Sequence, residues 1–488
     1  MTTRRRWVAG WLFAPLSCLA GQDLAPARPS LDAGVSARAF AASQAPEVAL
    51  ELADVIALAL RDNRAIRSAY LERVAQKFDL RLARDRFAPQ LTLKARYLGN
   101  RNHDDRYRHA ELAPGASLLT AYGTRLSLAW AYDHTRADTA GPRFRDGADL
   151  MIRQPLLRGA GPEVATAPLR LAQLTEQTNR LALKDAVAQT ITQVIGLYRE
   201  LLRAQEQLRI SRDALRRSQR LLEVNRSLIA AGRMAAFEIV QAEAQVANQE
   251  LALEGSRDRL HASRLSLLQA LALDLATPLR ASERPQALRL QVSAEQAQAR
   301  AEVLQPAYLM QLIASQQADI DLRLAHDQQR WDLSLVAGAS QAHERPGDNR
   351  AWEHYLGLEL EIPIGDLSRR QSLVRAQVMQ ATQQLRLAES RQQLRREVTD
   401  AVRDIEVRWR QYEIAGRALE LSRRTLQIEQ EKLALGRSSN FQVLSFESDL
   451  RHAQSAQLDA LIAYLQAQAA LDLTLGVTLE RWAVALND

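Results

Sequence analysis

The sequence predicts a mainly α-helical fold with membrane β structure, built by internal duplication of long α-helical hairpins. Three observations support this prediction. Long stretches lack proline and keep a seven-residue apolar repeat, shorter stretches alternate apolar and polar residues, and the second half of the chain repeats the first. A content of only 5% aromatic residues in 488 suits long helices better than a thick globular core.

The first long helix is expected from Glu163 to Ala231. Its apolar residues fall three and four positions apart, which is the spacing of a coiled-coil seam. They are Ile191, Val194, Tyr198, Leu201, Leu208, Leu215, Leu222 and Ile229. At ~1.5 Å per residue the helix is about 100 Å long. Gly232 is expected to end it in a left-handed turn, and a shorter helix then runs back to about Asp274.

Alternating runs predict strands that have one apolar and one polar face. One run follows Pro89, where Leu91, Leu93, Ala95 and Tyr97 alternate with polar residues. Others cover residues 125–132, 150–154 and 356–364. A single helix from Glu47 to Phe87 is expected before the first of them.

The two halves of the chain correspond to each other. The sequence DLRLA at 79–83 recurs at 321–325, an offset of 242, whereas Pro155 and Pro363 differ by 208 and Gly232 and Gly436 by 204. The 34 residues lost between the first two offsets fall where the first half has an extra alternating run. The chain is therefore an internal duplication with a β insertion in its first copy. The expected organisation is a signal peptide (1–20), a flexible segment (21–48), a first repeat (49–275), a linker (276–293) and a second repeat (294–488).

The first 20 residues have the pattern of a secretory signal peptide. Arg4, Arg5 and Arg6 precede a short apolar run, and the ending Cys18-Leu19-Ala20 places cleavage after Ala20. Lipid attachment at Cys18 is the alternative. Removal of the segment takes away the only cysteine and lowers the formal charge from +7 to about +4. That charge is too small and too dispersed to indicate a nucleic-acid partner.

At this point the chain resembles the TolC-like outer-membrane efflux protein family over nearly its whole mature length. The resemblance rests on Phe87-Ala88-Pro89-Gln90-Leu91, on the strand exits at 154–159 and 362–365, and on the turns Ala231-Gly232-Arg233 and Leu435-Gly436-Arg437. The second copy departs from the first where Trp331-Asp332 replaces Pro89-Gln90. The extra run between Gly115 and Asp138 is expected to be an extracellular hairpin, with added barrel strands as the alternative.

The resemblance implies a homotrimer whose protomers jointly build an outer-membrane β-barrel, continued by a helical tunnel across the periplasm of a Gram-negative cell. It also implies export, by efflux or type I secretion, together with a periplasmic adaptor (membrane fusion) protein and an inner-membrane transporter. The alternative is a periplasmic coiled-coil structural protein without a pore. The sequence does not reveal the cargo.

The resemblance also suggests site residues. Gly232, Arg233, Gly436 and Arg437 would form the tips that dock onto the adaptor. Glu238, Gln442 and Ser445 would lie at the periplasmic entrance, although Gln442 and Ser445 are neutral where family members often carry acidic residues. Glu238 fits a surface helix charge equally well.

Charged residues on the polar strand faces are candidates for the barrel lumen, or simply for the wetting of a water-filled barrel. They are Lys94, Arg96, Arg125, Arg153, Glu359 and Glu361. The sequence contains neither HExxH, nor a glycine-rich phosphate loop, nor Gly-x-Ser-x-Gly, so it predicts no enzyme and no cofactor. His103, His109, His343 and His354 are expected in or beside loops, and no metal site is predicted.

Overall fold

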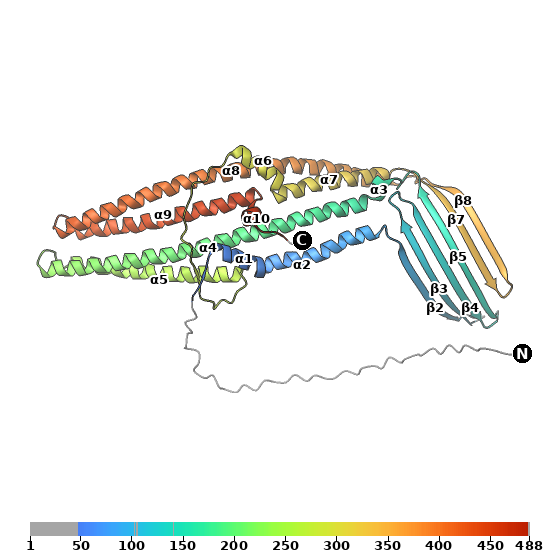
Figure 1. The fold of residues 1–488 in the computed structure, drawn as a ribbon, viewed down its shortest axis with the longest axis horizontal. Helices are drawn as coiled ribbons and strands as arrows, with labels where there is room; N and C mark the ends of the chain where they lie inside the picture. The colour runs from blue at the N-terminus through green and yellow to red at the C-terminus, as the bar shows by residue number, and fades with distance from the viewer. Residues whose placement is uncertain (1–46, 102, 104–105, 140, 487–488) are drawn as a thin grey trace, which may run out of the picture. The chain divides into compact units, whose positions relative to one another are not determined.

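A computed structural model describes residues 47–101, 103, 106–139 and 141–486. The expected signal peptide, Cys18, and nearly all of the expected flexible segment lie outside these residues. All elements below belong to the unit that begins at Glu47. In this unit long helices run alongside one another and end at a single β-sheet (Figure 1).

Two long helical hairpins dominate this unit. Helix α4 (Ala167–Ala230) has 64 residues and returns as α5 (Glu238–Ala270), and α8 (Leu367–Ala434) has 68 residues and returns as α9 (Asn440–Thr474). Gly232 and Gly436 turn the two hairpins with φ values of +68° and +75°. Glycine suits these positions because a Cβ atom disfavours positive φ. The predicted hairpins and their turning glycines are confirmed.

Each repeat begins with a broken helix rather than the single helix expected from Glu47 to Phe87. The first has α1 (Leu52–Asp62) and α2 (Arg64–Asp85), and the second has α6 (Ala294–Leu304) and α7 (Pro306–Asp327). The first break lies at Asn63, whose side chain accepts hydrogen bonds from the backbone N–H groups of Ala65 and Ile66. The single-helix prediction was wrong because no proline or glycine marks this cap.

The sheet has six antiparallel strands in the order β2-β3-β4-β5-β7-β8. The first repeat supplies β2 (Gln90–Arg101), β3 (Arg106–Leu119), β4 (Arg125–Ala137) and β5 (Gly141–Pro155). The second supplies only β7 (Asp332–Arg345) and β8 (Asn349–Glu361). The insertion is thus the β3–β4 pair, and it lies within the sheet. The expected extracellular hairpin between Gly115 and Asp138 is corrected accordingly, since both strands pair along most of their length.

A short parallel pair of strands links the two repeats. Strand β1 (Val48–Leu50) pairs with β6 (Leu279–Ala281), which lies inside the expected linker. Two four-residue helices complete the description, α3 (Pro162–Ala165) before α4 and α10 (Thr478–Arg481) after α9.

The main core lies where α1 and the end of α5 pack on the middle of α4. Its fully buried large side chains come chiefly from α4 and from the end of α5. They include Ile191, Ile195, Tyr198, Leu201, Leu267 and Leu268. The first half of the predicted seam is therefore buried within the chain, whereas Leu215 and Ile229 near the turn are only partly buried.

Candidate functional site

One face of the six-stranded sheet is polar. Directly paired residues in an antiparallel sheet share a face, and so do alternate residues of one strand. The pairs Arg96↔Glu111, Glu111↔Asp133 and Asp133↔Arg145 continue one polar row across β2, β3, β4 and β5. The same register brings all six residues suggested for a lumen to this face: Lys94, Arg96, Arg125, Arg153, Glu359 and Glu361.

Ion pairs connect strands across this polar face. The Arg153 guanidinium lies 3.2 Å from the Glu359 carboxylate and 3.8 Å from that of Asp332. Arg153 Nε also donates a hydrogen bond of 3.3 Å to the Ser334 hydroxyl. Farther along, Arg145 lies 3.8 Å from Glu344. The face is a surface of mixed charge, as expected of a wall that contacts water.

The opposite face of the sheet is apolar and uncovered in the single chain. Its leucines are largely exposed, with Leu91 at 81% and Leu358 at 68%. Cross-strand pairs such as Leu128↔Leu150 and Leu335↔Leu358 keep the same side apolar over several strands. Trp130 and Trp352 lie on this face, and aromatic residues of this kind mark membrane–water boundaries in β-barrels. An apolar surface of this extent indicates contact with lipid or with protein.

Both edges of the sheet are open. Strand β2 pairs only with β3, and β8 pairs only with β7. The outer N–H and C=O groups of these edge strands therefore have no partner strand within the sheet. Exposed edges of this length are templates for pairing with another chain.

Apolar residues also lie exposed along the helices at coiled-coil spacing. On α8 they recur every seven residues, at Val407, Ile414, Leu421, Ile428 and the C-capping Leu435, and each is at least 42% exposed. Helix α2 has a second exposed row, composed of Leu71, Val74, Phe78 and Leu82. A heptad row that faces no helix of its own chain indicates a further helix from another chain.

The described chain superimposes on solved outer-membrane channels along most of its length. The Campylobacter jejuni CmeC outer membrane channel matches at a TM-score of 0.66 and 14% identity, covering 88% of this chain and 86% of that one. The Vibrio cholerae outer membrane protein VceC matches at 0.66 and 16%, covering 87% and 96%. The open-state Neisseria gonorrhoeae MtrE channel matches at 0.63 and 15%, covering 88% and 89%. The chain has the TolC-like fold. Neither a protein-family model nor a curated protein matches the sequence.

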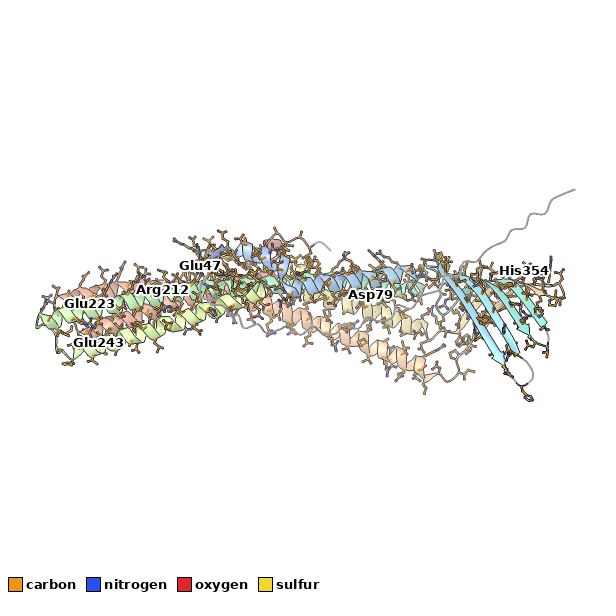
Figure 2. The ribbon with its side chains drawn as sticks, turned by 90° about the horizontal axis from the view of Figure 1, so that it is seen from below. Glu47, Asp79, Arg212, Glu223, Glu243 and His354 are labelled. Carbon is orange, nitrogen blue, oxygen red and sulfur yellow. The ribbon has the colours of Figure 1, made fainter. Side chains whose placement is uncertain are left out.

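The two hairpin turns of this TolC-like fold lie at the end of the helices opposite the sheet. Figure 2 shows Glu223 and Glu243 near the α4–α5 turn, and His354 on the sheet at the far end. Arg233 and Arg437 follow the turning glycines and are exposed. The Arg233 guanidinium donates a hydrogen bond of 3.3 Å to the backbone oxygen of Ala434, so one turn contacts the other.

The residues suggested for the periplasmic entrance lie just after these turns. Glu238 is the first residue of α5 and is partly exposed, while Gln442 and Ser445 are exposed on the first turns of α9. Gln442 also has a local role that the sequence prediction missed. Its backbone N–H donates to the Ser439 hydroxyl at 3.3 Å, and its side-chain oxygen accepts from the Ser439 N–H at 3.3 Å. This reciprocal pair is a capping box, which the spacing Ser439-x-x-Gln442 could have revealed.

Buried polar contacts join the two hairpins in the TolC-like fold, and the sequence prediction missed them as well. Asn225 on α4 donates a hydrogen bond of 2.8 Å to the side-chain oxygen of Asn440 on α9, and neither residue is exposed. Nearby, Arg217 donates to Glu447 at 2.7 Å, and Gln430 donates to the same carboxylate at 3.2 Å. These partners are more than 200 residues apart or on different helices, so no local pattern points to them.

A buried ion pair fixes α2 against α4. Two nitrogens of the Arg73 guanidinium contact the two carboxylate oxygens of Glu176 at 2.6 and 3.0 Å, and both side chains are almost fully buried. Arg180 reaches the same carboxylate at 3.2 Å. The hydrogen bonds and charge of Arg73 lower the pKa of Glu176. Because the geometry is bidentate, the pair specifies the helix register as well as supplying energy.

One cluster on the polar face has the composition of a metal site. His109, Glu111 and Asp133 can each place a ligand atom within 4.8 Å of the others. His109 belongs to β3, where its Nδ1 lies 3.0 Å from the Thr135 hydroxyl. However, Arg96 and Arg145 stand directly across from the two carboxylates and compete with a cation for them.

Among the residues that the structure describes, no helix combines the length and the apolar character needed to cross a membrane.

Proposed function

We propose that this protein is an outer-membrane channel that exports solutes across the periplasm and the outer membrane. One observation supports the proposal above all. A sheet with a polar and an apolar face continues directly into helices of 64 and 68 residues. At ~1.5 Å per residue these helices are each about 100 Å long. The apolar face fits lipid, the polar face fits a water-filled lumen, and the helices fit a tunnel below it.

The proposal includes a homotrimer. Six strands with two open edges cannot enclose a water-filled pore alone, whereas three copies of the six-stranded sheet supply eighteen strands. Barrels of 16–18 strands leave an aqueous channel. Edge β8 of one copy would pair with edge β2 of the next. The exposed heptad row on α8 and the apolar row on α2 would be covered at the same time.

The hairpin turns are proposed to dock onto a periplasmic adaptor protein that connects the channel to an inner-membrane transporter. Arg233 and Arg437 extend from the end of the hairpins, where a partner can reach them. Glu238, Gln442 and Ser445 would then line or border the entrance. The alternative, a periplasmic structural rod without a pore, leaves the exposed apolar sheet face without a role.

Reconstitution of the purified protein in planar lipid bilayers tests the central proposal. We expect stepwise ion conductance, and crosslinking in detergent that stops at three chains. A protein that fractionates with the outer membrane but never conducts would contradict the channel. A monodisperse monomer that conducts would contradict the trimer.

Cysteines at the turns test the docking proposal separately. Arg437→Cys should crosslink to the cognate adaptor in cells, whereas Arg350→Cys on β8, at the opposite end, serves as the matched control. Crosslinking from the control alone would mean that the orientation is inverted.

A further inference from the structure

A cavity of about 500 Å³ lies where the polar face of the sheet meets the helices. Its strand residues all belong to the polar face, and the rest come from the end of α2, the end of α7 and the segment after β5. Its charged lining consists of four arginines and two aspartates: Arg86, Arg125, Arg153, Arg158, Asp327 and Asp332.

The two aspartates in this cavity are already neutralised. Asp332 pairs with Arg158 at 2.5 Å and with Arg153 at 3.8 Å. Asp327 accepts a hydrogen bond of 2.8 Å from the backbone N–H of Gly159, and its other oxygen lies 3.6 Å from Arg330. Neither carboxylate is therefore free to balance a further arginine.

Two arginines of the cavity have no acidic partner. Across the described residues, the side chains of Arg86 and Arg125 make no ion pair and no hydrogen bond. Arg125 on β4 also stands directly opposite Arg153 on β5. Like charges at directly opposed positions destabilise a sheet. The fold thus holds an unfavourable pair of cations at the mouth of a cavity.

We propose that this cavity binds a soluble oxyanion of the phosphate class. Guanidinium groups present paired N–H donors that match the oxygens of phosphate and carboxylate, and an anion between Arg125 and Arg153 would relieve their repulsion. A lipid phosphate is a less suitable ligand, because the cavity opens on the polar face and the apolar face lies on the other side of the sheet.

The place of this site in transport rests on the proposed channel function, in which an anionic solute would meet three such cavities on its way through the barrel. Binding itself does not depend on conduction. The two proposals can therefore fail independently.

Thermal unfolding of the purified protein in detergent tests the site. Inorganic phosphate is titrated against sodium chloride at matched ionic strength, with wild type, Arg125→Gln and Arg143→Gln compared. Arg143 is a suitable control because it is an exposed arginine on the same face of β5, ten residues from Arg153 and without a printed partner on the strand across from it. We expect phosphate to raise the melting temperature of wild type and Arg143→Gln by several degrees more than that of Arg125→Gln.

Without phosphate, Arg125→Gln should melt no lower than wild type, because the substitution removes a repulsive pair. Tripolyphosphate should reproduce the phosphate effect at lower concentration, since more oxygens contact the arginines. Equal stabilisation of all three proteins would overturn the site, because phosphate stabilises proteins generally. Stabilisation only by vesicles that contain phosphatidic acid would overturn the soluble ligand.

Discussion

Removing the β3–β4 hairpin should narrow the barrel of the proposed trimer by about one third. With strands about 4.8 Å apart and tilted by about 40°, eighteen strands enclose a backbone diameter of about 36 Å. Twelve strands, which three copies would supply without the hairpin, enclose about 24 Å. The ratio of the cross-sections is roughly two, so the difference affects which solutes fit.

The register of the sheet defines the deletion. Gln90 pairs with Ser117, Ser117 with Ser127, and Ser127 with Met151, so Gln90 and Met151 lie in one row and on one face. Replacing residues 102–139 by an Asn-Gly turn lets β2 pair with β5 in that row. The polar and apolar faces stay continuous, and the turn suits a two-residue hairpin.

Electron microscopy of the two trimers in detergent measures the barrel diameter directly. Exclusion of poly(ethylene glycol) added from the barrel side provides a second measurement, and the largest polymer that enters should be smaller for the deletion. Conductance alone is a poor measure, because the helical entrance can limit it. A wild-type barrel of about 24 Å would refute the reasoning, since β3 and β4 would then not form part of its wall.

Three further predictions concern single residues. Leu128→Arg on the apolar face should destabilise the folded protein by about 2 kcal/mol in lipid vesicles, whereas Ser127→Arg on the polar face should change little; the reverse order in denaturant titrations would place lipid on the wrong face. Glu176→Gln should cost about 2 kcal/mol at pH 7, because it leaves buried Arg73 without its ion-pair partner. Since the folded-state pKa of Glu176 is lowered, its contribution is present above the unfolded pKa and is lost as pH falls through the folded value. The melting-temperature difference should therefore shrink below about pH 4, near the ordinary pKa of glutamate, and a constant difference would count against the ion pair. Gln442→Asp should increase cation selectivity in reversal-potential measurements, since three copies would form a negative ring at the entrance; unchanged selectivity would put the entrance elsewhere.

The long helices and their turns could be predicted because their signals are local. A heptad pattern, the lack of proline and a turning glycine are all visible within one stretch of sequence. The paired faces of the sheet were also largely predictable, since alternation along each strand defines its two sides. Strand β3 was missed because Pro114 and Gly115 interrupt its alternation and suggest a loop rather than a strand.

The contacts that hold the candidate site together could not be predicted in the same way. The cavity arginines come from α2, β4, β5 and the segment that follows β5, and only the register of the sheet brings Arg125 opposite Arg153. The same holds for Asn225 and Asn440, which lie on different hairpins. In each case the partner is set by tertiary packing, to which a single sequence gives no access.

The break in the leading helix records the history of the chain. Asn63 and Gln305 are separated by the offset of 242 that relates the two repeats, and α1 and α6 have 11 residues each, while α2 and α7 have 22 each. Both amides cap the second helix segment, Asn63 through Ala65 and Ile66 and Gln305 through Tyr308 at 2.7 Å. One event explains both corners: an ancestral half-length chain already had the bend when it was copied. After the copying, the side chain changed from one amide to another, while the hydrogen-bond acceptor that makes the bend was retained.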